Sequence, residues 1–192
     1  MGSRLAPSLL PPHAAVLGGA VAAAAPCDLR SVSTLLYYSF ALSGEKDAMS
    51  RVVQPRSAWS KRSNASSGGL HPEEVHLLWR PPGSAAPQVL HYSCRDHALE
   101  SRHTIPADAW AALTAGLPDG AFLLAISCRA WREVWKYGER GLRYTHLDLG
   151  HALGALAYAA AMLGWKIAPL TGVSGTAADR FAIGRLAHAA AR

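Results

Sequence analysis

The segment Leu147–Trp165 constrains the fold more than any other part of the chain. It is strongly apolar, and its length approaches that of a membrane span. However, it is rich in alanine rather than leucine, and it carries Asp148 and His151 near one end. The residues before it, from Lys136 to His146, are polar. We therefore expect a long apolar helix buried in a soluble domain, rather than a membrane protein.

Small residues recur along this predicted helix. Gly150 and Gly154 are four residues apart, and Ala157 and Ala161 continue at close to the same spacing. A stripe of small side chains lets another backbone approach closely. In a soluble protein, the stripe predicts a tightly packed central helix, and it also permits two copies of the chain to meet as a homodimer.

Composition indicates one globular domain. Half of the 192 residues are hydrophobic and 17% are charged, which suits a sizeable core and excludes a disordered chain. The formal net charge of +6 favours an anionic ligand such as a phosphate-bearing cofactor. The arginines are scattered, so we expect no nucleic-acid partner. The three cysteines form no CxxC pair and are expected to be reduced thiols rather than zinc ligands.

The first 27 residues are a separate low-complexity segment or linker in our interpretation, and the domain proper is expected over residues 28–192. A stretch rich in Ala, Gly and Val runs from Ala14 to Ala25 behind Pro11 and Pro12. The alternative is a targeting peptide with an Ala-x-Ala end. We expect a cytoplasmic protein, with organelle targeting or export as the alternative.

The remaining patterns predict an α+β fold with a small, mainly antiparallel sheet. Asp28 is a plausible N-cap for a helix that Gly44 can stop, and Glu45–Ser67 reads as an extended loop. The other expected elements are a hairpin of Val75–Trp79 and Gln88–Tyr92, a helix over Pro106–Leu117, a buried central strand over Ala121–Cys128, and helices over Trp131–Tyr144 and Ala177–Arg192.

The run KRSNASSGGLHP, from Lys61 to Pro72, is the first candidate site. Its small residues offer backbone donors and hydroxyls, its glycines let the main chain lie against a ligand, and Arg62 supplies a fixed positive charge. Such a loop suits a phosphate or the edge of a flat, polar heterocycle. By composition alone, it would also suit a flexible surface loop.

The second candidate site is WREVWKYGERGLRYTHLDLGH, which starts at Trp131. If this segment is helical, Lys136 lies one turn from both Arg132 and Arg140. A lysine among other cations can have its pKa lowered enough to act as a base, and Tyr137 can share a hydrogen bond with it. A solvated, salt-bridged helix face is the alternative. Asp148 and His151 are expected to cap a helix or to form a buried pair, and we expect no metal site.

The order of these motifs resembles the SagB-type (azoline oxidase-like) branch of the nitroreductase-like family. The string RSNASSGGLHPEEVHLL is similar to one signature of that branch, with Ala65 where proline is common, and the Trp131–His151 block is similar to the other. LLYYSFALS and the HY pair at His91 also match, as does GWKIAPLTGV, which would place Gly172 at the reactive edge of a flavin. The resemblance covers roughly Asp28 to Val173.

This resemblance implies a nitroreductase-like fold, an FMN cofactor, flavin sites between the subunits of a homodimer, and an azoline-peptide or small-molecule substrate. It carries the catalytic roles over to Lys136 and Tyr137. The residues expected to contact the flavin are Arg62, Asn64, Ser66, Ser67, Gly68 and Gly172.

Two departures support a second hypothesis, a catalytically inactive scaffold or binding domain. No Arg-Arg-Ser element precedes the first predicted helix, although the family uses such basic residues to hold the FMN phosphate. Family members also continue with a further strand and an extension that wraps the partner subunit. Three alternatives stay open on this pattern: a C-terminally truncated gene product, one half of a duplicated protein, or a degenerate copy.

Overall fold

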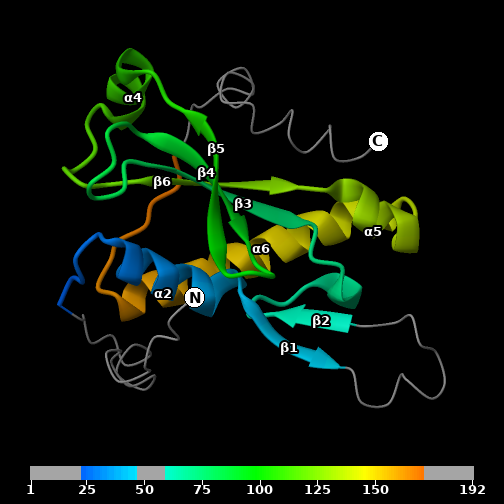
Figure 1. Cartoon of the computed structure of the whole chain (residues 1–192). Helices are drawn as coiled ribbons and strands as arrows, with labels where there is room; N and C mark the ends of the chain where they lie inside the picture. Colours follow the sequence, from blue (N-terminus) through cyan, green and yellow to red (C-terminus); the bar gives the residue numbers. More distant parts are fainter. Residues whose placement is uncertain (1–22, 47–58, 171–192) are drawn as a thin grey trace.

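The computed structural model describes residues 23–46 and 59–170. Within these ranges, the main sheet has four strands: β3 (Glu73–Trp79), β4 (Gln88–Ser93), β5 (Ala98–Thr104) and β6 (Leu123–Cys128). Their order is β5-β4-β3-β6 and all neighbours are antiparallel (Figure 1). The predicted α+β class and the β3–β4 hairpin are confirmed. Gly172 and the predicted helix Ala177–Arg192 lie outside the described residues.

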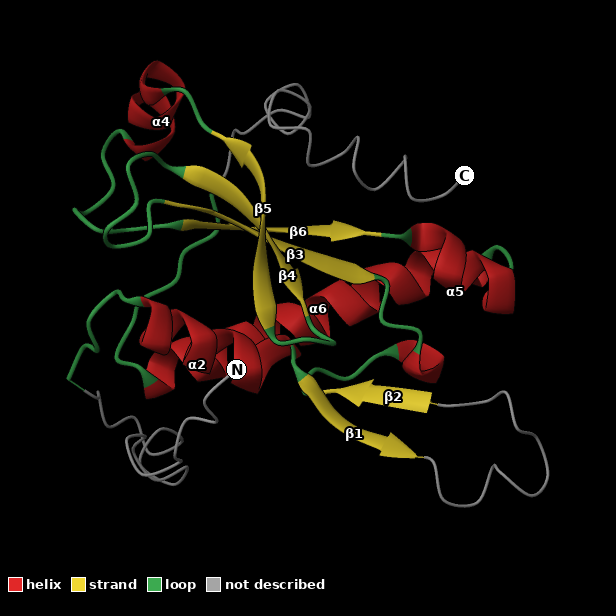
Figure 2. Ribbon diagram, viewed as in Figure 1, coloured by secondary structure: helices red, strands yellow, loops and turns green. Residues whose placement is uncertain are grey.

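Side chains alternate between the two faces of the sheet along each strand. Apolar residues lie on both faces and form two separate clusters. Val75, Leu77 and Trp79 of β3 point into the main core, towards the helices α2 (Leu29–Phe40) and α6 (Arg140–Met162). Leu78 points the other way, into a smaller cluster under α4 (Ala107–Thr114). Figure 2 shows α2 and α6 below the sheet, and α4 at the upper left, away from these two helices.

The expected buried central strand over Ala121–Cys128 is wrong in its position. Strand β6 lies at an edge of the four-stranded sheet, and all six of its residues are half-buried. Its apolar run is continuous because Leu124 and Ile126 pack on the main core while Leu123 and Ala125 pack on the smaller cluster. An edge strand with both faces covered thus has the same pattern as a central one.

The first helix begins as predicted but ends earlier. Asp28 caps α2 by accepting a hydrogen bond from the Ser31 amide at 2.8 Å. The helix ends at Phe40, and Gly44 lies in strand β1 (Leu42–Lys46), which pairs with β2 (Trp59–Arg62). The expected extended loop over Glu45–Ser67 is therefore partly wrong, because it contains strand residues. The chain then forms a short 3-10 turn, η2 (Ser67–Gly69).

The second half of the domain contains two helices, as predicted, but the break between them lies at Gly138 rather than between Tyr144 and Leu147. Helix α5 (Ala130–Tyr137) ends at Gly138, whose φ of 57° and ψ of −135° suit glycine, and α6 follows at once. Gly141 at the start of α6 packs tightly on α5: a β-carbon there would lie 2.5 Å from the Val134 nitrogen. The backbones of the two helices therefore meet closely at Gly141.

Helix α6 buries a different face from the one expected. The buried positions are Gly141, Thr145, Asp148, Ala152, Leu156, Ala159 and Ala160. A β-carbon added to Gly150 or Gly154 would meet nothing within 4 Å. The glycine stripe thus faces away from the core, and its interpretation as packing within the chain is wrong. No helix in the described ranges has both the length and the hydropathy needed to cross a membrane.

The end of α6 is bound to the start of the described chain. The Ala25 amide donates to the Leu163 carbonyl at 2.8 Å, and the Trp165 indole nitrogen donates to the Ala25 carbonyl at 2.7 Å. Cys27 packs on the main core nearby. Contacts of the folded domain therefore begin a few residues before the expected boundary at residue 28.

Candidate functional site

The turn Ser66–Gly69 is anchored from beneath by Asp148, a residue of α6 that is only 1% exposed. The Asp148 carboxylate accepts hydrogen bonds from the Ser66 hydroxyl at 2.7 Å, from the Ser67 hydroxyl at 2.8 Å, and from the Ser67 amide at 2.9 and 3.0 Å. The Ser66 oxygen also accepts the His71 amide at 2.8 Å. The hydroxyls of Ser66 and Ser67 are therefore directed into the protein.

Lys136 and Tyr137 lie on the other side of the same turn. The Lys136 ammonium donates to the Gly68 carbonyl at 3.4 Å, and the Lys136 side chain is exposed. Gly68 has a φ of 63°, and a β-carbon there would lie 2.6 Å from the Lys136 nitrogen and still closer to the Tyr137 hydroxyl. The structure thus joins the two motifs, about seventy residues apart, at a point where a side chain on residue 68 would have to displace the ends of Lys136 and Tyr137.

The expected pair of arginines around Lys136 is not formed on one helix. The break at Gly138 places Arg140 on α6, whereas Lys136 is on α5. Arg132 is on the helix of Lys136, but its guanidinium donates to the His71 carbonyl at 2.6 Å and to Glu74 at 3.0 Å. The argument that two neighbouring cations perturb Lys136 therefore does not follow from helical spacing.

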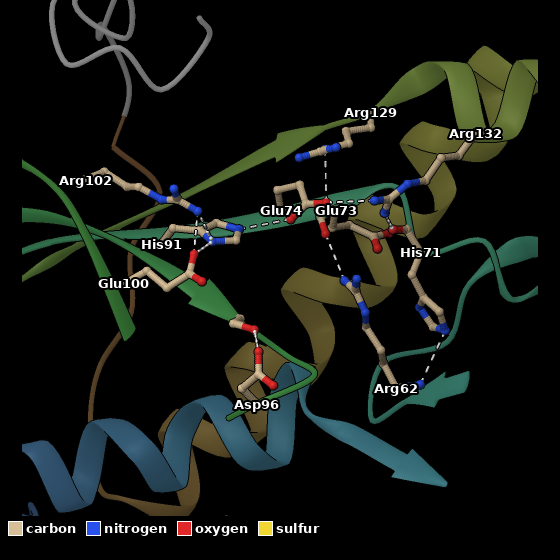
Figure 3. Close-up of polar contacts among 11 residues, drawn as sticks. Arg62, His71, Glu73, Glu74, His91, Asp96, Glu100, Arg102, Arg129 and Arg132 are labelled. Atoms are coloured by element: carbon tan, nitrogen blue, oxygen red, sulfur yellow. Dashed lines mark hydrogen bonds and ion pairs between the residues drawn. The ribbon is translucent and has the colours of Figure 1, made fainter. Parts of the chain in front are cut away.

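Arg62 and Asn64 also form hydrogen bonds within the protein, to residues at the end of the loop and the start of β3. The Arg62 guanidinium donates to the Glu73 carbonyl at 2.9 Å, and its amide donates to the His71 ring at 3.3 Å. Asn64 is 2% exposed and donates to a Glu73 carboxyl oxygen at 3.5 Å. His71 has a φ of 47°, which lies in the left-handed region. These contacts, some of which Figure 3 shows, hold the loop in shape.

A group of three buried carboxyls beneath the site was missed by sequence reasoning. Glu73 of β3, Glu133 of α5 and Asp148 of α6 are each no more than 1% exposed. Burial, followed by the charges of Asp148 and Glu73, raises the pKa of Glu133 to about 7. The alternative interpretation of the segment after Trp131 as a solvated helix face is wrong at Glu133, which is buried. Burial also raises the pKa of Glu73.

A second polar network lies on the other face of β3 (Figure 3). Glu74 binds Arg129 at 3.1 Å, Arg132 at 3.0 Å and the His91 ring at 3.1 Å. Burial raises the pKa of Glu74, but the His91 hydrogen bond and the two arginines outweigh burial and lower it to about 2. His91 also binds Glu100 at 2.9 Å. The network ties the start of α5, and hence Lys136, to the sheet.

The geometry defines what could be bound. The loop side chains are held by Asp148 and Glu73, so a ligand on the outer side would meet the backbone of Ser66–Gly69, which carries no large side chain, together with Lys136 and Tyr137. Among the described residues, no group of three or more His, Cys, Asp and Glu side chains is arranged to hold a metal ion.

Comparison with solved structures places the fold. A protein assigned as a nitroreductase from Anabaena variabilis is 28% identical over 68% of this chain, with a TM-score of 0.56. The E. coli microcin synthetase McbBCD complex, solved with truncated pro-MccB17 bound, is 23% identical over 71% of this chain, with a TM-score of 0.54. A Ralstonia eutropha protein assigned as a nitroreductase is 13% identical over 84%, with a TM-score of 0.54.

The chain therefore has a nitroreductase-like fold, as predicted. It spans 26% of the Anabaena chain and 50% of the microcin synthetase chain. No protein-family model matches the sequence, and no curated protein matches it either.

Proposed function

We propose that this chain is an FMN-dependent oxidoreductase of the SagB type, acting on azoline peptides or similar small molecules. The observation that carries the proposal is the contact of Lys136 and Tyr137 with Gly68, because it joins the two motifs of the sequence at one surface. The likeness to nitroreductases and to the McbBCD complex supports the same chemistry.

The outer side of the Ser66–Gly69 turn, with Lys136 and Tyr137 beside it, would hold FMN, which would supply hydride-transfer chemistry when bound. The roles of this chain's residues follow from the geometry. The turn offers a surface without side chains, held rigid by Asp148. Lys136 is exposed next to that surface, where it would remove the proton that leaves the substrate as the hydride is transferred. Tyr137 would orient the substrate by a hydrogen bond.

The residues first expected to grip the flavin take a different part in this proposal. Arg62, Asn64, Ser66 and Ser67 shape the turn from inside, and Gly68 gives the close approach. Gly172, which lies outside the described residues, remains a proposed contact at the reactive edge.

A homodimer is part of the proposal because α6 exposes an apolar face. Large side chains on it include Leu147 at 50% exposure, Leu153 at 49% and Tyr158 at 58%. The outward stripe of Gly150 and Gly154 lies on the same side and lets a second backbone approach. An exposed apolar face of this kind usually marks an interaction surface. We propose that a second copy of this helix covers it.

Flavin titration of the purified chain tests the function. We expect quenching of FMN fluorescence that saturates at one flavin per chain, followed by flavin reduction when an azoline peptide is added. A chain that takes up no FMN at high micromolar concentration contradicts the proposal.

The second candidate, an inactive scaffold or binding domain, is favoured by one observation. Three of the residues expected to contact the flavin instead form hydrogen bonds within the protein, namely Arg62, Ser66 and Ser67. A chain that binds the azoline peptide but no FMN would support this candidate. Turnover with bound FMN would exclude it.

A further inference from the structure

The three buried carboxyls beneath the site carry different numbers of hydrogen bonds. Both oxygens of Asp148 accept bonds from Ser66 and Ser67, and one of those donors is a backbone amide, which can only donate. This arrangement needs Asp148 as a carboxylate. Its charge is therefore held beneath the turn, in a position that is closed to solvent.

Glu133 has no such support. It is 0% exposed, and neither of its carboxyl oxygens completes a hydrogen bond of good geometry within the described chain, although Asp148 is near enough to share a proton with it. The charged groups that face it are Asp148 of α6, Glu73 of β3 and Lys136 on its own helix. An unpartnered buried carboxylate next to a second anion is strongly disfavoured, so the neutral acid is the form that fits this position.

We propose that Glu133 is a positioning residue: while it keeps its proton, Asp148 holds the Ser66–Gly69 turn against Lys136 and Tyr137, and when it loses the proton the turn is released. Ionised Glu133 would place a second negative charge beside Asp148, and opening a path for water would relieve this buried pair. The turn lies directly over Asp148 and contributes three of the donors that contact it, so water could reach the pair by displacing the turn.

This inference identifies a pH dependence for the site and rests on the proposed function only where turnover is concerned. Burial and the neighbouring carboxylates raise the pKa of Glu133 to about 7, so the release would occur as pH rises through neutrality. Glu73 does not replace Glu133 in this role, because one of its oxygens already accepts from Asn64 and its position is on the sheet rather than on the helix of Lys136.

Amide hydrogen exchange at Ser67 tests the proposal on the full chain without requiring flavin. After correction for intrinsic rates, protection of the Ser67 amide should fall about tenfold between pH 6 and pH 8 in the wild-type protein. In Glu133→Gln, which cannot ionise, it should change by less than about twofold. The amide of Ile105, bound to Pro87 at 2.8 Å beside the smaller cluster, is the internal control and should not change in either protein.

Two further variants keep the test decisive. Glu133→Met has a similar volume and no ionisable group, so it must behave like Glu133→Gln if the latter folds poorly. Asp148→Asn removes the neighbouring charge, and Ser67 should then be weakly protected at both pH values. Equal protection of Ser67 at pH 6 and pH 8 in the wild type overturns the proposal, as does a pH step that persists in both Glu133 variants.

The pH profile of turnover separates this inference from the proposed function. If the chain is an oxidoreductase, its kcat should fall over the same pH interval in the wild type and not in Glu133→Gln. A step in Ser67 exchange without any turnover means that the enzyme assignment has failed while the role of Glu133 stands. Turnover without a step in exchange means the reverse.

Discussion

The ammonium group of Lys136 lies 3.4 Å from the carbonyl oxygen of Gly68, above a turn that has no room for a β-carbon. This relationship joins a helix of the second half of the chain to a loop of the first half. It also makes the glycine a sensitive position, because any side chain there would displace the ends of Lys136 and Tyr137.

Gly68→Ala should therefore affect function more than stability. The left-handed φ of 63° costs alanine roughly 1 kcal/mol, and the clashing atoms are the flexible ends of two side chains. Gly83→Ala is the matched control, because Gly83 has a φ of 81° and nothing within 4 Å of an added β-carbon. We expect similar losses in urea denaturation for both variants, but a fall in turnover for Gly68→Ala alone. Equal turnover in the two variants would show that Gly68 lies outside the site.

Lys136→Ala should lower kcat without releasing the flavin. General base catalysis contributes about 10²–10⁴-fold, so kcat should fall by roughly that factor while FMN absorbance stays with the protein. Lys166→Ala replaces an exposed lysine beyond the far end of α6 and should leave kcat unchanged. Near-normal turnover of Lys136→Ala with FMN bound would return Lys136 to the solvated helix face.

Gly154→Leu should act on association rather than on the fold. Nothing in the described chain lies within 4 Å of a β-carbon at Gly154, so leucine can be accommodated within one protomer. Across a close helix–helix contact, the same side chain would overfill the interface. Sedimentation velocity should therefore show a dimer for the wild type and for Ala112→Leu, a similar change at an exposed position of α4, and a folded monomer for Gly154→Leu. A monomeric wild type contradicts the dimer.

Acid should destabilise the protein through its buried histidines. Burial, followed by the charge of His91, lowers the pKa of His76 to about 4 from an ordinary value of 6.5. Between these two pH values, His76 binds a proton in the unfolded chain but not in the folded chain. The free energy of unfolding therefore decreases as pH falls from 6.5 through 4. His76→Leu should remove up to about 3 kcal/mol of this loss between pH 7 and pH 4 in urea denaturation.

His146→Gln replaces an exposed histidine and is the control for this measurement. Its stability should stay within about 0.5 kcal/mol of the wild type across the range. An unchanged acid slope in His76→Leu would mean that His76 is protonated in the folded state after all.

The local parts of the fold could be predicted from the sequence because they depend on interactions between residues that are close in the chain. Asp28 and the helix it caps interact over one or two turns, and the β3–β4 hairpin is marked by two apolar runs and a stiff turn. Strand β5 was missed because most of Ala98–Thr104 is exposed and polar, so burial leaves no pattern in it. Gly138 gave no warning of a helix break, since an isolated glycine within a helical pattern is often tolerated.

The site was only half readable for a different reason. The motifs identified the turn and the Lys136–Tyr137 pair, but they did not reveal which way the serines point. That direction depends on Asp148, more than eighty residues later, and on the burial of Glu133 against it. In the sequence, serine hydroxyls next to glycines suggest a bound ligand. In the folded chain, the acceptor for these hydroxyls is Asp148.

The bond between Trp165 and Ala25 also has a mechanical consequence. It brings the start and the end of the described residues together near the end of α6. Asp148 lies fifteen residues before Leu163, about 22 Å along the helix axis from that point. A pull on the two ends would be carried first by this short junction, with little load on the turn above Asp148.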